Sequence, residues 1–454
     1  MNTAAKTVAA LLFVALLGGV LTIPLRDSDG SPPRRATVAR PTPARSPTET
    51  RHARREPTGP LRTKRFVQRF PRACLRPVAR PDDGGLIAAL NGRRVTIVTS
   101  SGESRATITD VAPVVRPPLA WSPSGRYIAV GPQGLFWTAE GEVVLFANGE
   151  FSHGMVQGST GPWAWSPISD CGVAIEDDFE GALQVNHIDP HLAANIRLVN
   201  KGVESFAYSP DGRTLGLVIA ERGIRSLWFA DLDASRLHEV KRFDSGICCV
   251  NLGGWTPDGS ALLYWAGPGA SVMADGWPLR SIDRTGEVAR WGRTLTRPDI
   301  LVGCSETLYA IDRRDRLDAE GQLRALPSDT PLSTQEVSAA SCNVRGRIVA
   351  SARIDGSARS QLVLLDGDGG QVVTSDPDYS DQRPQWASGI GVLFERLPII
   401  ERCEHDTPEC AAQVWFIPEG GTPRSLGLRL NREDYGLRAI VDWSATPPNG
   451  LPVS

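Results

Sequence analysis

Lysine is scarce in this sequence, and the short motifs of the common enzyme families are absent from it. Lysine and arginine together number 49, and only four of them are lysine, a bias that indicates a GC-rich genome more than a function. No Gly-x-Ser-x-Gly elbow, His-Glu-x-x-His helix, P-loop or dinucleotide fingerprint occurs. These absences exclude a serine-hydrolase domain of the usual form, but not an enzyme whose catalytic carboxylates are dispersed along the chain.

Aromatic residues are also few, at 7% of the chain, yet tryptophan (12) is as frequent as phenylalanine (12). Many of the tryptophans open one recurring pattern: an aromatic anchor, Ser-Pro, a turn with glycine and then an apolar strand. The aromatic anchors are Trp121, Trp165, Tyr208, Trp255, Trp386 and Trp443, with weaker copies at Cys304 and Cys342. Successive anchors lie 38 to 57 residues apart, and a period of about 40–50 residues is typical of four-stranded propeller blades.

Each copy has the chemistry of a turn followed by a strand. In the segment Ser209 to Gly212, proline presets φ, aspartate bonds the neighbouring backbone and glycine closes the turn. The apolar run behind it, Leu215 to Ile219, is a strand signal. One such unit cannot bury both of its faces, whereas a series of them can do so by stacking. We therefore expect an all-β fold.

The repeat resembles that of TolB-like and WD40-like β-propellers. The resemblance rests on four anchor segments and two later strand–turn segments: Ala120–Val130, Ala164–Ile175, Ala207–Ile219, Gly254–Trp265, Trp228–Asp233 and Val363–Gly369. It covers about residues 84–446. It implies a β-propeller, an exported or membrane-anchored bacterial protein, and protein partners at the cell envelope.

The number of blades is left between two values. We expect seven blades if the Cys304 copy counts as a repeat, and six if residues 300–335 are an insertion. The first strands of the propeller domain, residues 81–446, have no anchor before them, and Trp443 stands alone at its end. We expect residues 439–445 to close the ring on the first blade, followed by a tail of residues 447–454.

The N-terminus carries an uncharged apolar run, residues 8–23, preceded by Lys6. Its length lies between that of a signal-peptide core and that of a spanning helix. We expect residues 1–25 to be a signal-anchor that meets the membrane through residues 8–23, with a cleaved signal peptide or a buried helix as alternatives. The arginines that follow favour a cytoplasmic propeller, but the signal-like start, the resemblance and the cysteines favour an extracytoplasmic one. We expect a membrane-anchored extracytoplasmic domain, or else a secreted one.

Residues 26–80 form a basic, proline-rich linker. They carry 14 arginines and Lys64 against four acidic side chains, whereas the rest of the chain is acidic. Because such a segment buries little apolar surface, we expect a disordered stalk. A tether to anionic lipid, to a phosphate-bearing wall polymer or, last in rank, to nucleic acid is the alternative. Phe66, Val67 and Phe70 are expected to mark where the stalk docks.

Eight cysteines permit disulfides in an exported chain. Cys403 and Cys410 flank one loop, and we expect them to form a local bridge rather than a metal site with His405. Acidic loops at residues 176–180 and 376–381 are interpreted as solvated, so no metal or cofactor is expected. The pairing of the other cysteines is left open. Cys304 and Cys342 are expected either to pack as small apolar residues or to form a bridge. Cys248 and Cys249 are adjacent and are not expected to bond to each other, but either could pair with the distant Cys74 or Cys171.

The function expected from these features is a non-enzymatic extracytoplasmic binding scaffold, which meets a protein or a cell-envelope ligand through loops at one rim. A propeller-type hydrolase or lyase with carboxylates at the channel mouth, and a ligand-sensing receptor domain, are the alternatives. No catalytic residue is identified, and nucleic acid is not an expected partner. The segments that interrupt the repeat, residues 176–181, 266–278 and 397–412, are where we expect the ligand to bind.

Overall fold

Antiparallel β-strands make up nearly all the regular structure in the computed structural model of the protein, as the repeat predicted. The structure describes residues 62–80, 85–91, 94–109, 119–130, 135–137, 143–145, 163–176, 181–187, 195–200, 202–268, 276–313, 320–353, 359–365, 370–387, 389–399, 411–430 and 440–443. All of them belong to one compact unit, Arg55–Ser454. The expected signal-anchor, most of the linker and the C-terminal tail lie outside the described residues. Among the described residues, no helix is long and apolar enough to span a membrane.

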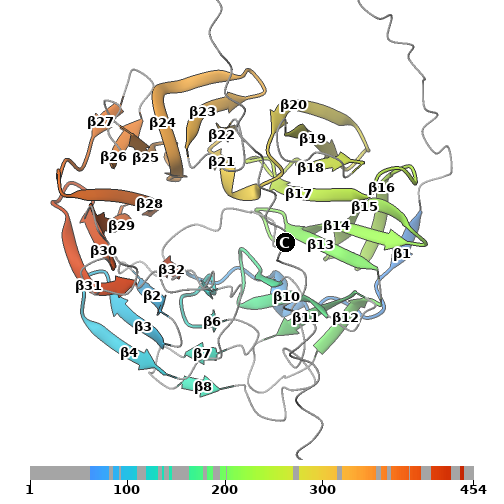
Figure 1. Cartoon of the computed structure of the whole chain (residues 1–454). Coiled ribbons are helices and arrows are strands. Elements are labelled where there is room, and N and C mark those ends of the chain that lie inside the picture. The colour runs from blue at the N-terminus through green and yellow to red at the C-terminus, as the bar shows by residue number, and fades with distance from the viewer. Residues whose placement is uncertain are drawn as a thin grey trace, which may run out of the picture. The chain divides into compact units, whose positions relative to one another are not determined.

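The strands follow the chain in groups of four, which we call strand groups (Figure 1). The first four are β32 (Ile440–Trp443) with β2 (Leu86–Asn91), β3 (Arg94–Thr99) and β4 (Ser104–Ile108); β5 (Leu119–Trp121), β6 (Ile128–Val130), β7 (Leu135–Trp137) and β8 (Val143–Leu145); β9 (Trp163–Trp165), β10 (Cys171–Glu176), β11 (Ala182–His187) and β12 (Asn195–Val199); and β13 (Val203–Tyr208), β14 (Thr214–Glu221), β15 (Ile224–Asp231) and β16 (Arg236–Arg242). The second group consists of two hairpins whose strands β6 and β7 lie side by side.

The remaining four strand groups complete the series. They are β17 (Cys249–Trp255), β18 (Ala261–Gly267), β19 (Trp277–Asp283) and β20 (Val288–Thr294); β21 (Leu301–Cys304), β22 (Thr307–Asp312), β23 (Gly321–Leu326) and β24 (Thr330–Cys342); β24 again with β25 (Ile348–Arg353), β26 (Ser360–Leu365) and β27 (Gly370–Val372); and β28 (Tyr379–Ala387), β29 (Gly391–Pro398), β30 (Ala412–Pro418) and β31 (Arg424–Leu430). A short 3₁₀ helix, η3 (Pro298–Ile300), precedes β21.

Neighbouring strand groups pack on one another, and the last packs on the first. The first strands of adjacent groups meet, as in β13 with β17, β24 with β28 and β32 with β5, and β31 of the eighth group meets β2. The core is accordingly divided into clusters that each combine two or more neighbouring groups; one contains Val218 of β14 and Leu262 of β18. A ring of four-stranded antiparallel sheets is a β-propeller.

The ring is closed by pairing the two ends of the domain. The C-terminal strand β32 runs antiparallel to β2, with Trp443 opposite Ile87 and Ile440 opposite Leu90. The N-terminal strand group is thus completed from the far end of the sequence. This pairing covers an edge of β2 that would otherwise expose backbone donors and acceptors.

The described residues form eight strand groups, where the sequence favoured seven blades, with six as the alternative. Counting anchors from Trp121 to Trp386 gives seven, and the group that Trp443 completes is the eighth. The Cys304 copy is a full repeat rather than an insertion. It shares the long strand β24 with the next group. The first part of β24, as far as Val337, pairs with β23, and the last part, as far as Cys342, pairs with β25. The register of the pairing with β25 shifts between Val337 and Ala339.

The anchor aromatics are packing residues between neighbouring strand groups. Trp121, Trp165, Tyr208, Trp255 and Trp386 are all buried, whereas the side chain of Trp443 lies outside the described residues. The indole Nε1 of Trp165 donates to the backbone oxygen of Ala120 at 2.9 Å, and that of Trp255 donates to Ala207 at 3.1 Å. Each of these two indoles therefore bonds to the residue just before the previous anchor, which fixes the spacing between repeats.

The polar residue that follows four of the anchors is buried and organises the turn. Ser209 is 2% exposed, and its hydroxyl accepts from Thr214 N at 2.9 Å and contacts Asp211 Oδ1 at 2.6 Å. Ser122, Ser166 and Thr256 occupy the same place and are also buried. A buried hydroxyl needs such partners, because an unpaired one costs about 1–3 kcal/mol.

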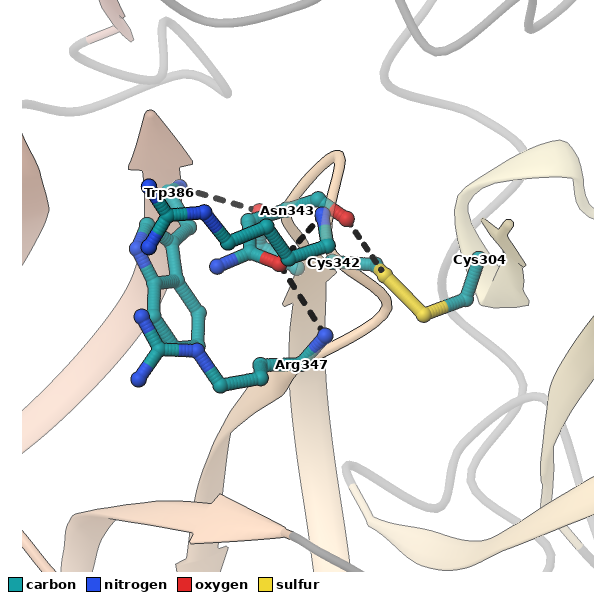
Figure 2. The surroundings of a disulfide bond; sticks show 7 residues. Cys304, Cys342, Asn343, Arg347 and Trp386 are labelled. Carbon is teal, nitrogen blue, oxygen red and sulfur yellow. Dashed lines mark hydrogen bonds between the residues drawn. A yellow bond between two sulfur atoms is a disulfide. The ribbon is translucent and has the colours of Figure 1, made fainter. Parts of the chain in front are cut away.

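The Cys304 and Cys342 copies replace the missing anchor with a disulfide, shown in Figure 2. The two Cα atoms are 5.4 Å apart, and the bridge joins strands β21 and β24. Asn343 takes the role of the turn serine, because its Oδ1 accepts from Arg345 N and Arg347 N, both at 3.0 Å. The guanidinium of Arg347 lies 5.0 Å from the ring centre of Trp386 in the next group. Of the two expectations for Cys304 and Cys342, packed thiols or a bridge, the structure shows the bridge.

Candidate ligand-binding site

Residues 62–80, which composition assigned to the disordered stalk, are folded onto the third and fourth strand groups. The short strand β1 (Thr63–Arg65) pairs with the outer edge of β16 (Figure 1). Phe66 and Phe70 are buried among side chains of both groups, whereas Val67 is 53% exposed. Docking through the two phenylalanines is therefore confirmed, and the boundary of the folded domain moves to residue 62 or earlier. Composition missed this because two aromatics and one cysteine are enough to fix a segment that is otherwise polar.

Glu239 on β16 carries the ion pair that holds β1 in place. Its side chain is fully covered; Arg62 Nε donates to it at 2.8 Å and Arg242 Nη2 at 2.7 Å. Burial opposes ionisation of this carboxyl, but the hydrogen bonds from Arg242 and Arg62 outweigh burial and hold the pKa of Glu239 below its ordinary value. Glu239 is thus ionised at neutral pH and bridges two arginines that come from different strands.

The ring of Trp228 and the carboxylate of Glu221 complete this contact. The Arg62 guanidinium lies 5.1 Å from the centre of the Trp228 ring, and the Lys64 ammonium lies 5.0 Å from it. Arg62 Nη1 is 2.7 Å from Glu221 Oε2, and Lys64 pairs with the same carboxylate. Four of the charged groups around β1 are therefore mutually neutralised.

A disulfide anchors the second half of the segment. Cys74 lies in the 3₁₀ turn η1 (Arg72–Leu75) and bonds to Cys171 at the start of β10, with 5.5 Å between Cα atoms and 97 residues between them in sequence. Cys74 is fully buried, and its carbonyl accepts from Ser169 Oγ at 2.7 Å. Val78 N donates to Ile168 O at 2.8 Å. These contacts fix the backbone on both sides of the turn.

A turn of the fourth strand group positions the middle of the segment. Ser235 adopts the left-handed conformation, with φ of 51°, that a non-glycine residue rarely takes. Its carbonyl accepts from Phe66 N at 3.0 Å, and its hydroxyl accepts from Phe70 N at 3.2 Å. The turn and the segment thus hold each other in one arrangement.

Between them lies an arginine-lined pocket of about 630 Å³. We call it the arginine pocket, and its lining consists of Arg69, Phe70, Arg72, Leu75, Arg76, Arg213, Asp233, Ala234 and Ser235. The four arginine side chains are exposed. Phe70 and Cys74 are buried and Leu75 packs against the same core cluster, whereas Arg69, Arg72 and Arg76 on this short stretch are exposed.

The charge of the arginine pocket is largely uncompensated. Arg213 Nη1 is 3.1 Å from Asp233 Oδ2, the one carboxylate in the lining. Arg69, Arg72 and Arg76 have no ion-pair partner within the described ranges. Guanidinium groups present planar forks of donors that match the oxygens of phosphate and carboxylate groups. The site can therefore bind an anionic group by charge and by hydrogen bonds.

Carboxylate side chains also gather in places, but they are not arranged to bind a metal ion in the described part of the chain. A second pocket of about 240 Å³ has Asp258, Asp283, Glu287 and Glu306 in its lining. The carboxylate of Asp283 accepts a hydrogen bond from the Thr285 hydroxyl of its own turn, and this bond lowers the pKa of Asp283. No group of three or more histidine, cysteine, aspartate or glutamate side chains in the described part of the chain is placed to hold a metal ion.

The acidic loop at residues 376–381 is partly explained by an ion pair. Asp381 is buried and accepts two hydrogen bonds from Arg396, at 2.7 and 2.9 Å. Arg396 Nη1 lies 3.5 Å from Asp376, and its guanidinium lies 4.3 Å from the ring centre of Trp415. The interpretation of this loop as solvated is therefore wrong for Asp381, which Arg396 holds in the interior, whereas Asp376 is partly exposed and Asp378 is exposed.

The other predicted site residues are mostly outside the described residues. Cys403 and Cys410, with the loop they flank, are outside, as are residues 177–180 and 269–275. Cys248 and Cys249 keep free thiols. The arginine pocket was not predicted as a site, although Arg69, Arg72 and Arg76 belong to the linker, for which binding to anions was the alternative to a disordered stalk. The alternation of arginines with Phe66, Phe70 and Cys74 indicates a segment with one buried face, but it does not show which part of the fold covers that face.

Comparison with known proteins adds little. No protein-family model matches the chain, and no curated protein does. The chain is similar to a putative TolB from Agrobacterium tumefaciens, at 13% identity and a TM-score of 0.31 over 85% of this chain and 99% of that one. It is also similar to a eukaryotic initiation factor, at 13% identity and a TM-score of 0.48 over 82% of this chain and 90% of that one. A third similar structure is an oligogalacturonate lyase in complex with manganese, at 17% identity and a TM-score of 0.33 over 55% of this chain and 70% of that one. These likenesses are too distant to carry an argument about function.

Proposed function

We propose that the protein is a binding scaffold outside the cytoplasm whose arginine pocket holds an anionic ligand of the cell envelope. The observation that carries the proposal is the set Arg69, Arg72 and Arg76, which have no ion-pair partner among the residues that the structure describes and lie on a segment held by a disulfide and two buried phenylalanines. The disulfide and the phenylalanines fix the backbone of the segment, so that binding of an anion has to order only the arginine side chains and not the chain that carries them. We favour a phosphate-bearing envelope polymer over a protein partner, since guanidinium forks match phosphate oxygens.

The extracytoplasmic location is part of the same proposal. The disulfides Cys74–Cys171 and Cys304–Cys342 support it, because such bonds persist in oxidising compartments and are rare in the cytosol. Residues 8–23 would tether the scaffold to the membrane. To test the location, thiols are alkylated in intact cells before lysis, and tryptic peptides are then examined by mass spectrometry. A linked Cys74–Cys171 peptide supports export, whereas alkylated Cys74 contradicts it.

The pocket is tested by binding of a labelled phosphate polymer, inorganic polyphosphate, to the purified full-length protein. The triple variant Arg69→Ala, Arg72→Ala, Arg76→Ala is expected to bind about tenfold more weakly, since three exposed ionic contacts of about 0.5 kcal/mol each add up to about 1.5 kcal/mol. Poly-glutamate as a second probe distinguishes phosphate from carboxylate recognition.

The control variant removes the same charge elsewhere. Arg94, Arg126 and Arg290 are exposed arginines of three other strand groups, and replacing all three with alanine lowers the net charge equally. Polyphosphate binding by this control should remain close to that of the wild type. Equal weakening of both triple variants would show that the overall charge, and not the pocket, binds the polymer.

A further inference from the structure

The two adjacent cysteines at the start of the fifth strand group form no disulfide. Cys249 is the first residue of β17 and pairs with Gly267 of β18, while Cys248 precedes it in the loop. Cys248 is exposed and Cys249 is half-buried, and both are free thiols. The other four cysteines that the structure describes are consumed by two disulfides. The pair is therefore an available dithiol in a protein that otherwise oxidises its described cysteines.

A disulfide between these two neighbours is geometrically unfavourable. Consecutive Cα atoms are about 3.8 Å apart across a trans peptide bond, whereas disulfides usually join Cα atoms at least about 4.4 Å apart. The two disulfides of this chain have Cα separations of 5.5 and 5.4 Å. The same proximity suits chelation, because both sulfurs can bind one ion without forming a bond to each other.

The surroundings of the two thiols favour a soft ligand. Cys248 Sγ donates to the carbonyl of Gly267 at 3.8 Å. The hydrogen bond between the two thiols, and then burial, raise the pKa of Cys249 above its ordinary value. Glu204 and Arg225, which face the pair from the fourth strand group, are joined by hydrogen bonds of 2.6 and 2.7 Å and so largely cancel each other's charge. Protonated thiols are poor nucleophiles, but a thiophilic ion can displace both protons.

We propose that Cys248 and Cys249 form a two-sulfur site for a soft thiophilic ion, of which monovalent copper is the best-suited class. Thiolates bind Cu(I), zinc and iron–sulfur clusters, and of these Cu(I) is the one whose low coordination number fits a site with two sulfurs. On binding, two S–H bonds are lost, two metal–sulfur bonds form, and two protons leave to solvent. The described residues provide no third histidine, cysteine or carboxylate ligand nearby, which disfavours zinc, a metal that wants four ligands.

The test is a competition titration of Cu(I) between the full-length oxidised protein and a chromophoric Cu(I) chelator, without oxygen. The wild type should bind one ion at this pair, with an affinity that rises with pH as two protons are released per ion. Cys248→Ser and Cys249→Ser should each weaken binding by at least about a hundredfold, because a single sulfur loses the effective concentration of its partner. Zn²⁺ should not compete at equal concentration.

The control is Ser245→Ala, an exposed residue of the same loop, which should leave binding unchanged. Thermal unfolding of each variant shows whether the fold is intact. Retention of tight binding by either single cysteine variant, or by the double variant Cys248→Ser, Cys249→Ser, would assign the ion to other sulfurs and overturn the proposal. Competition by Zn²⁺ would overturn the choice of a soft ion.

Discussion

Single side chains set the geometry of each repeat through one buried hydrogen bond. The indole of Trp255 reaches back to Ala207, and the hydroxyl of Ser209 closes the turn that starts the next strand. Neither contact is functional in the sense of binding a ligand. Their value is positional, since a turn of fixed shape every 40–50 residues makes sheets that stack.

The turn serine Ser209 should contribute more to the free energy of unfolding than an exposed serine does. We expect Ser209→Ala to lower the free energy of unfolding by about 1–3 kcal/mol, because it leaves Thr214 N without its acceptor in a buried turn. Urea unfolding followed by tryptophan fluorescence measures the change. Ser245→Ala at an exposed position is the comparison, and an equal loss in both variants would contradict this account.

A structural feature can be predicted from the sequence when the contacts that determine it join residues that are close together in the chain. The turn at Ser209–Gly212 involves residues at most five apart, so its pattern predicted a turn and a strand correctly. The arginine pocket depends on Cys74 bonding to Cys171, 97 residues away, and on Phe70 meeting a turn near Ser235. Nothing in the composition of residues 62–80 specifies those partners. Eight cysteines allow many pairings, so the pocket could not be predicted from residue types alone.

Among the elements, the segment of residues 62–80 depends most on a cross-link. Removing it with Cys74→Ala, Cys171→Ala should destabilise the protein by about 2–5 kcal/mol, because the bridge closes a long loop. Limited trypsin digestion should then cut rapidly after Arg69 and Arg72, which the wild type protects by holding this backbone on the third strand group; Arg76 precedes Pro77 and is not a trypsin site. Polyphosphate binding should fall in parallel.

The other disulfide provides the matched comparison. Cys304→Ala, Cys342→Ala also removes a bridge, but one that joins β21 to β24 far along the chain from the arginine pocket. This variant should lose stability while trypsin cleavage between residues 62 and 80 stays slow. Rapid cleavage there in both variants would mean that general instability, and not the local anchor, exposes the segment.

Acid should weaken the attachment of β1. The folded-state pKa of Glu239 is lowered, so the stabilisation from this carboxylate is complete above the unfolded pKa of about 4.3 and is lost as the pH falls through the folded pKa. We expect Glu239→Gln to cost about 1–3 kcal/mol at pH 7, and to make stability less sensitive to acid below about pH 5. Melting temperatures measured from pH 7 to pH 3 show this. The exposed Glu287→Gln should follow the wild-type curve, and a Glu239→Gln curve parallel to the wild type at all pH values would refute the assignment.

For the whole molecule, the decisive contact is the pairing of β32 with β2. Eight strand groups make a ring only because residues 440–443 return to the N-terminal group, where four residue pairs join the two strands. A chain that ends at residue 439 loses this ladder and exposes the edge of β2, whose residues Ile87 to Leu90 are apolar. We expect its melting temperature to fall by at least about 5 °C, and we expect it to self-associate through the open edge. A chain that ends at residue 443 keeps β32 and should melt close to the full-length protein, with the same monomer content by light scattering. If both truncations melt together, the ring is held by packing between neighbouring sheets, and the closing strand is dispensable.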